Sequence, residues 1–158
     1  MITKQGDIPV EYTVDQVFSE ATKSKHLPKN IGILKLDCKD SVLRRNTVIQ
    51  ARIGFLFFKF GMDARISEFE YNQTLYLAGS TRDAEMNLAF DFQPTVDGNA
   101  TNVAYNFNLD LKSSVARSAE VRFGSNRTHE LIGGVVLGIV DNVQRGLDAT
   151  YAPFQRPA

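Results

Sequence analysis

The chain has 158 residues, of which 43% are hydrophobic and 23% are charged, an ordinary composition for a globular domain. Basic and acidic residues both total 18, so no whole-molecule field would attract nucleic acid. The single cysteine excludes an internal disulfide. No basic segment followed by an apolar run is visible at the amino terminus. We therefore expect a cytoplasmic protein with one domain over residues 1–158.

The amino-terminal segment predicts a strand followed by two short helices. Residues 2–10 are predicted to form the strand. Thr13 and Gln16 have the spacing of a capping box, in which each side chain satisfies a free backbone amide at the start of a helix. A second short helix is expected from Ser24 to Leu27, where Pro28 would stop it.

From about residue 31 to residue 111 the hydrophobic period is two, which is typical of strands with one wet face and one buried face. Asp97-Gly98 is expected to form the hairpin turn between the last two strands. The predicted buried face comprises Phe58, Phe60, Met62, Ala64, Ile66, Met86, Leu88, Phe90, Phe92, Val103, Tyr105, Phe107, Leu109 and Leu111.

After the predicted strands, the spacing of the hydrophobic residues becomes that of an α-helix. Apolar side chains between residues 131 and 147 share one arc of a helix, and Pro153 is expected to end that helix soon after Tyr151. Residues 113–127 are compatible with either a helix or an extension of a strand. Because a sheet with one apolar face must be covered, the sequence predicts an α+β fold. In this fold about six to seven antiparallel strands wrap around a long C-terminal helix.

Three segments resemble the START-like superfamily, also called the helix-grip or polyketide-cyclase-like (SRPBCC) fold. IPVEYTVDQVFSEAT resembles its first strand and helix, and HLPKNI resembles the Leu-Pro segment before the second strand. ARIGFLFFKFGMDARI resembles the hairpin of the branch named after the G subunit of carbon-monoxide dehydrogenase, although Phe55, Leu56 and Phe57 replace a more polar loop. The resemblance extends over residues 2–150.

The resemblance implies a cavity between the sheet and the C-terminal helix that holds a lipid, an isoprenoid or a polyketide-like molecule. Carriers, enzymes and recruitment modules all use this fold, so the fold does not choose among them. The eleven phenylalanines can either fill a solid core or line such a cavity.

Three glycines in the predicted C-terminal helix help to distinguish a solid core from a cavity. Each lowers the stability of the helix by about 1 kcal/mol relative to alanine. Gly138 would leave room beside the apolar arc of the helix, although a close helix–strand contact would explain it equally well. The first hypothesis is a non-catalytic carrier or sensor of a hydrophobic small molecule, with no cofactor. Its expected lining is Phe58, Phe60, Met62, Met86, Leu88, Phe90, Tyr105, Phe107, Leu131, Val135, Gly138 and Ile139.

The second hypothesis is an enzyme of the cyclase or dehydratase type that acts on an apolar substrate. Tyr105 and an unidentified carboxylate would supply acid–base chemistry, although Tyr105 also fits an ordinary core position. Arg65, Asp91 and Asp110 are out of phase with the apolar face, so we expect them to meet water.

Metal chemistry is not expected, because only His26, His129 and Cys38 are available as nitrogen or sulfur ligands and they lie far apart in the sequence. The same separation argues against a cysteine nucleophile paired with histidine. Cys38 is instead expected to be a buried structural residue on a strand.

The third hypothesis is a recruitment module. Residues 55–58 form an apolar run at a predicted hairpin tip, which is expected to lid the cavity, contact a partner or membrane, or fold under the C-terminal helix. Residues 112–127 are locally basic, with only Glu120 opposing four cationic side chains, and this pattern is typical of a solvated face. No nucleic-acid partner is expected.

Overall fold

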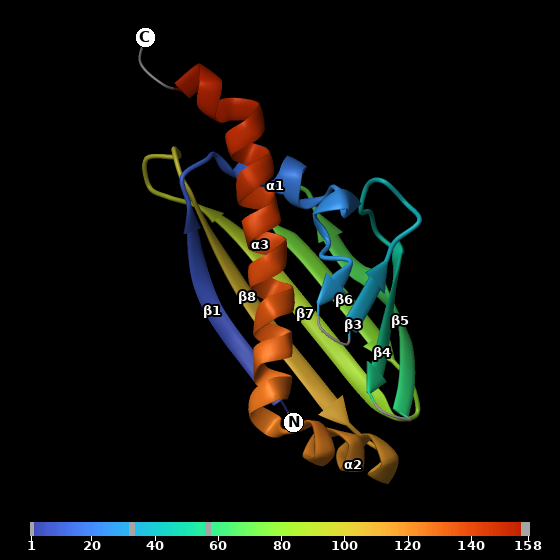
Figure 1. The fold of residues 1–158 in the computed structure, drawn as a ribbon. Coiled ribbons are helices and arrows are strands. Elements are labelled where there is room, and N and C mark those ends of the chain that lie inside the picture. Colours follow the sequence, from blue (N-terminus) through green and yellow to red (C-terminus); the bar gives the residue numbers. More distant parts are fainter. Residues whose placement is uncertain (1, 32–33, 56–57, 156–158) are drawn as a thin grey trace.

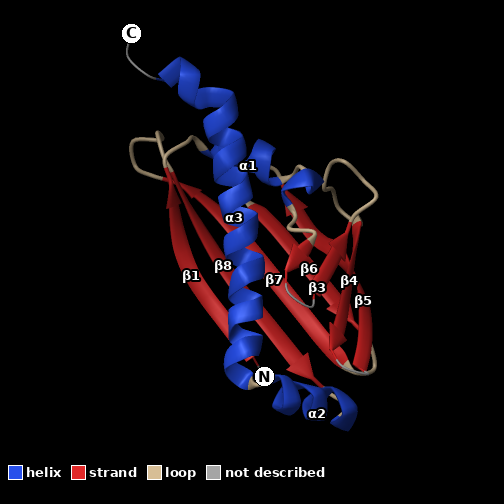
Figure 2. Cartoon of the chain, in the orientation of Figure 1, coloured by secondary structure: helices blue, strands red, loops and turns tan. Residues whose placement is uncertain are grey.

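The computed structural model describes residues 2–31, 34–55 and 58–155, and it has the predicted α+β architecture (Figures 1 and 2). The first part of the chain forms β1 (Ile2–Val10), α1 (Val14–Ala21), the 3-10 helix η1 (Ser24–His26), β2 (Asn30–Ile31) and β3 (Leu34–Asp37). The central part forms β4 (Val48–Phe55), β5 (Phe58–Glu70), β6 (Thr74–Ser80), β7 (Ala84–Pro94) and β8 (Thr101–Leu111). The last part forms α2 (Ser114–Phe123) and α3 (Ser125–Gln155).

The described strands form one antiparallel sheet in the order β1-β8-β7-β6-β5-β4-β3-β2. β2 has only two residues, so the sheet has seven strands of four or more residues, in agreement with the prediction. Consecutive strands are neighbours except at β1, which pairs with β8 from Ile2 opposite Leu109 to Val10 opposite Thr101. The sheet curls, and α3 lies along its concave face (Figure 1).

The predicted alternation decides which side chains reach that concave face. On β5, Met62 and Ile66 are buried, whereas Asp63 and Arg65 are exposed. The pairing of β5 with β6 shifts register between Ile66 and Glu68, and such a bulge changes the phase of the strand by one residue. Phe69 therefore returns toward the apolar interior while Glu68 stays exposed.

The start of α1 is stabilised by the predicted capping box. The Thr13 hydroxyl accepts from the Gln16 backbone amide at 3.3 Å, and the Thr13 amide donates to the Gln16 side-chain oxygen at 3.0 Å. These two bonds satisfy amides that a helix start otherwise leaves free. They fix the direction of α1, which buries Val17 and Phe18 against the sheet.

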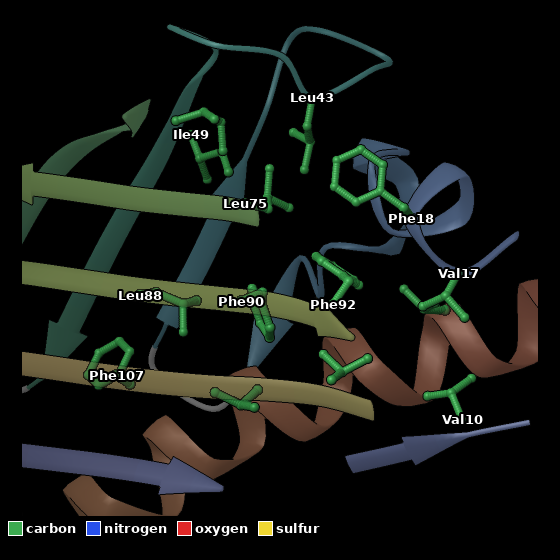
Figure 3. Packing of buried hydrophobic residues seen from close by; sticks show 14 of the residues in the cluster. Val10, Val17, Phe18, Leu43, Ile49, Leu75, Leu88, Phe90, Phe92 and Phe107 are labelled. Carbon is green, nitrogen blue, oxygen red and sulfur yellow. The ribbon is translucent and has the colours of Figure 1, made fainter. Parts of the chain in front are cut away.

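The interior beneath α1 is closely packed (Figure 3). The Phe18 ring makes edge-on contacts with Phe69, Tyr71 and Phe92, at centroid separations of 5.3, 5.5 and 5.1 Å. A small void of about 30 Å³ lies at this end of the interior. Such edge-on pairs add stability beyond that of burial alone.

The carboxyl-terminal half of α3 is tied to the loop between β1 and α1. The Tyr12 hydroxyl donates to Asp148 at 2.6 Å, and this hydrogen bond is the main reason that the pKa of Tyr12 rises to about 12. The Tyr12 carbonyl in turn accepts from the buried Thr101 hydroxyl at 2.8 Å. The final helix, the first loop and the start of β8 are therefore joined by hydrogen bonds.

The segment that the sequence left undecided contains α2 and the start of α3. The Ser113 hydroxyl caps α2 by accepting from the Ala116 amide at 3.0 Å, and Gly124, with φ of 99°, separates the two helices. α3 continues through Pro153 to Gln155, so the prediction that Pro153 ends the helix soon after Tyr151 is wrong. A proline retains a helical φ and here removes one backbone donor near the end of the helix.

Among the helices of the described residues, none combines the length and the apolar character that crossing a membrane requires.

Candidate ligand cavity

An apolar cavity of about 130 Å³ lies between the sheet and α3, and we call it the central cavity. One water needs only roughly 10–15 Å³ of such space, so this cavity exceeds the voids of an ordinary packed interior. β4, β5, β7, β8 and α3 supply most of its wall. The lining residues are Leu27, Leu34, Leu36, Ile49, Ala51, Ile53, Phe60, Met62, Ala64, Leu77, Met86, Leu88, Phe107, Leu109, Thr128, Leu131, Ile132, Val135 and Ile139.

Small residues on neighbouring strands help to explain why the space is unfilled. Ala51 and Ala64 contribute only methyl groups to the wall, and Ala64 pairs with Gly79 on β6. A Cβ at Gly79 would lie 2.6 Å from the Met62 sulfur, so the Met62 side chain occupies the space over Gly79. Ala51 on β4 and Ala64 on β5 therefore leave volume unfilled in the wall, with α3 spanning the sheet above them, whereas Met62 fills the space over Gly79.

The wall of the central cavity carries no titratable side chain among its described residues. Thr128 is its one polar residue, and the Thr128 hydroxyl already donates to the Gly124 carbonyl at 3.0 Å. An apolar wall stabilises a hydrophobic occupant by removing its surface from water, at about 25 cal/mol per Å². It offers no partner to a buried polar or charged group, which would lose its hydration without compensation.

A second apolar space of about 90 Å³, here called the outer pocket, adjoins the central cavity beneath α2. The two share Ile53, Phe60, Leu109, Thr128 and Leu131. The outer pocket adds lining residues from α2 and from the end of β8, namely Leu111, Ala116, Ala119, Glu120 and Phe123. The apolar space therefore continues from the centre of the fold toward α2.

The structure places most of the predicted lining residues together. Those at the wall of the central cavity are Phe60, Met62, Met86, Leu88, Phe107, Leu131, Val135 and Ile139. Phe90 lies instead beside the small void beneath α1. The side chains of Phe55 and Phe58 lie outside the described part of the chain, as do Leu56 and Phe57 entirely, so the predicted apolar tip stays a prediction.

Tyr105 is on the expected face of β8 but does not line the central cavity. Its register partner on β1 is Gly6, and a Cβ at Gly6 would lie 2.9 Å from the Tyr105 hydroxyl oxygen. The ring therefore leans over the edge strand, where the glycine leaves room for it. The acid–base group named in the enzyme hypothesis is consequently turned away from the cavity.

Gly138 contacts Pro28 and is absent from the described lining of the central cavity. A Cβ at Gly138 would lie 3.3 Å from Cγ of Pro28, closer than ordinary van der Waals contact. Of the two explanations weighed for this glycine, close approach of the helix to another segment is the one that this contact supports. The packing partner is the segment after η1 and not a strand.

Three further predictions concern polar residues outside the cavity. Cys38 follows β3 and is half-buried, with its thiol 3.5 Å from the Asp40 carbonyl, so the prediction of a buried strand residue is wrong. Desolvation raises the pKa of the Cys38 thiol, which disfavours the thiolate. Arg65 is exposed as expected, whereas Asp91 and Asp110 are only partly exposed.

A buried polar cluster that the sequence did not predict joins α1 and η1 to α3. Glu20 accepts from Lys23 at 2.8 Å and lies 2.7 Å from Nε2 of buried His26. Burial opposes ionisation of Glu20, but the hydrogen bonds from Lys23 and His26 outweigh it, and the pKa of the carboxyl group is lowered. Asn142 of α3 donates to the His26 carbonyl at 2.9 Å.

Gly146 of α3 provides the space for this cluster. A Cβ at Gly146 would overlap Oε1 of Glu20 and lie 2.8 Å from Cε1 of His26. The sequence signal was available, because a glycine on the inner face of a helix indicates close approach. Its partners come from a different segment, however, so the sequence did not identify them.

No family model and no curated protein matches the sequence. Solved structures do match. A conserved protein from Geobacillus kaustophilus superposes with a TM-score of 0.66 at 13% identity, over 94% of this chain and 97% of that one. Ara h 8.0201 superposes with a TM-score of 0.65 at 9% identity, over 94% of this chain and 99% of that one. A protein from Thermus thermophilus superposes with a TM-score of 0.61 at 11% identity, over 95% of this chain and 99% of that one.

The chain has the helix-grip fold. The likeness extends over almost the whole of each chain, so it includes the sheet and the final helix together. Identities of 9–13% show the helix-grip fold alone and carry no activity or ligand from one protein to another. Membership of the carbon-monoxide-dehydrogenase-related branch stays a prediction from the hairpin sequence.

Proposed function

We propose that the chain is a START-like protein that binds or carries a hydrophobic small molecule in the central cavity without catalysing a reaction on it. The observation that carries this proposal is the apolar space of about 130 Å³ enclosed by the sheet and α3. A lipid chain, an isoprenoid or a polyketide-like compound has the required chemistry. The helix-grip neighbours support the proposal through the shared fold.

The enzyme alternative has less support in the geometry. Catalysis on an apolar substrate needs at least one acid or base within hydrogen-bond reach of the reacting atom. The described wall of the central cavity offers none, and Tyr105 leans toward Gly6. Glu120 is the one titratable residue described at the outer pocket, and it lies on α2, away from the centre of the fold.

We expect the purified chain to bind a naphthalene-type or fatty-acid fluorescent probe saturably, with about one site per chain. Because the probe binds the folded state, it should also raise the free energy of unfolding by about 2.7 kcal/mol at a hundredfold excess over Kd. Fluorescence titration and thermal unfolding with and without probe measure the two effects. Unsaturable binding, or no shift in unfolding, would contradict the proposal.

A pair of tryptophan variants locates the site. Val135 lines the central cavity, whereas Leu137, on the same helix, is 58% exposed. Val135→Trp should fill the cavity and weaken probe binding by at least about tenfold, a change worth about 1.4 kcal/mol. Leu137→Trp should bind as the parent chain does. Equal affinity in both variants would place the probe elsewhere, and circular dichroism checks that both are folded.

A further inference from the structure

The outer face of α2 carries basic and apolar side chains that no other described residue covers. Val121 is 80% exposed and Val115 is 61% exposed. Arg117 and Arg122 are exposed as well. At 100° per residue, Val121 lies between the two arginines on the helix surface, and Val115 lies next to Arg122.

The opposite face of α2 closes the outer pocket. Ala116, Ala119 and Phe123 line that pocket together with Glu120. The inner face of α2 is therefore mostly apolar, and its outer face carries both valines and arginines. The only acidic residue of α2 is on the inner side, so it does not neutralise the outer arginines.

The cationic side chains around α2 differ in their contacts with the rest of the chain. Lys112 pairs with Glu85 at 3.3 Å, and Arg117 donates from Nε to the Leu111 carbonyl at 3.0 Å. Arg127 lies 6.0 Å from the centre of the Phe123 ring. Within the described residues, the Arg122 guanidinium group has neither an ion pair nor a hydrogen-bond partner. Its charge, beside the exposed Val121, is available to an external anionic surface.

We propose that the outer face of α2 docks onto an anionic lipid bilayer and so places the outer pocket next to the membrane surface. Arginines attract the negative surface of such a bilayer, and exposed valines beside them gain burial at the boundary between headgroups and acyl chains. This combination favours a bilayer over a soluble partner, because a bilayer supplies charge and an apolar layer in one surface. The proposal concerns a surface and goes beyond the ligand proposed above.

Figure 1 shows where matched controls can be placed. α2 lies at one end of the molecule beside the end of β8, whereas α1 and the turn between β7 and β8 lie at the other end. That distant turn contains Val96, which is fully exposed. The loop between β3 and β4 contains the exposed Arg45. Substitutions at these two positions change the same side-chain types far from α2.

The first test is sedimentation with vesicles made of phosphatidylcholine and phosphatidylglycerol in equal parts, compared with phosphatidylcholine alone. We expect binding to the anionic vesicles that weakens as salt is added. Arg122→Glu changes two units of charge and should lower the partition coefficient by about tenfold or more. Val121→Ser should lower it by a smaller factor. Arg45→Glu and Val96→Ser should bind as the parent chain does.

The second test does not depend on a loss of binding. The chain contains no tryptophan, so Val121→Trp introduces a single reporter at the proposed surface. Its emission should shift to shorter wavelength with the anionic vesicles, because the indole leaves water. Val96→Trp should show no shift. The probe-binding titration should be unchanged by Arg122→Glu, which separates this inference from the proposed ligand cavity.

Three results would overturn the assignment. One is that the chain sediments with neither type of vesicle at low salt. Another is that it binds neutral vesicles equally well and Arg122→Glu has no effect. The third is that sedimentation equilibrium shows a concentration-dependent dimer that Val121→Ser abolishes, since a second copy of the chain would then be the occupant of this face.

Discussion

Replacing Phe18 with alanine is expected to lower the free energy of unfolding by about 3–5 kcal/mol. The side chain is only 1% exposed, and its ring contacts Phe69, Tyr71 and Phe92 edge-on. The substitution removes this burial and leaves a cavity beneath α1 that the curved sheet cannot close. Urea unfolding followed by circular dichroism measures the change.

The control for this prediction is Leu137→Ala, which truncates an apolar side chain on the outer surface of α3. A side chain that is 58% exposed contributes little burial, so the expected change is within about 0.5 kcal/mol. If Phe18→Ala and Leu137→Ala destabilised the chain equally, α1 would not be packed as described.

The second large effect is expected at Gly146. Alanine at this position gains about 1 kcal/mol of helix propensity. Its Cβ would displace the Glu20 carboxylate from buried His26, however, and leaving a buried charge without its partner costs roughly 3–5 kcal/mol. The net expectation is a loss of about 2–4 kcal/mol in the free energy of unfolding.

Two comparisons make this prediction specific. In a Glu20→Ala background the carboxylate is absent and only the contact with Cε1 of His26 remains, so Gly146→Ala should cost much less than in the parent chain, and the double-mutant cycle should show strong coupling. Gly133→Ala on the same helix is the matched control. A Cβ there would lie 2.5 Å from Nζ of Lys4, the end of a flexible side chain that can move away. Additive effects of Glu20→Ala and Gly146→Ala would refute the explanation.

The features that could be predicted from the sequence depend on neighbours in the chain. The alternation on β5 and the capping box at Thr13 and Gln16 arise within a few residues, and both are confirmed. The apolar arc of α3 arises in the same way. Since one apolar sheet face must be covered by the one long apolar helix, the architecture followed from these local signals.

The features that could not be predicted depend on which distant segments meet. Tyr105 has the phase of a cavity residue, yet its ring turns toward Gly6, almost one hundred residues earlier in the chain. Gly138 similarly faces Pro28 of the segment after η1. Periodicity specifies the face of a strand or helix, whereas the direction of a side chain across that face depends on the volume of neighbours from other elements.

The pairing of β1 with β8 has a consequence for how the chain folds during synthesis. β1 leaves the ribosome before the other described strands, and its partner in the sheet is β8, the last of them. Closing such a long loop is entropically unfavourable until many other contacts have formed, so topologies of this kind fold slowly. β3 to β8 can each pair with the preceding strand as they emerge, beginning with β3 on β2. β1 must wait, with the backbone amides and carbonyls that face β8 unpaired, and joins the sheet only when residues 101–111 are available.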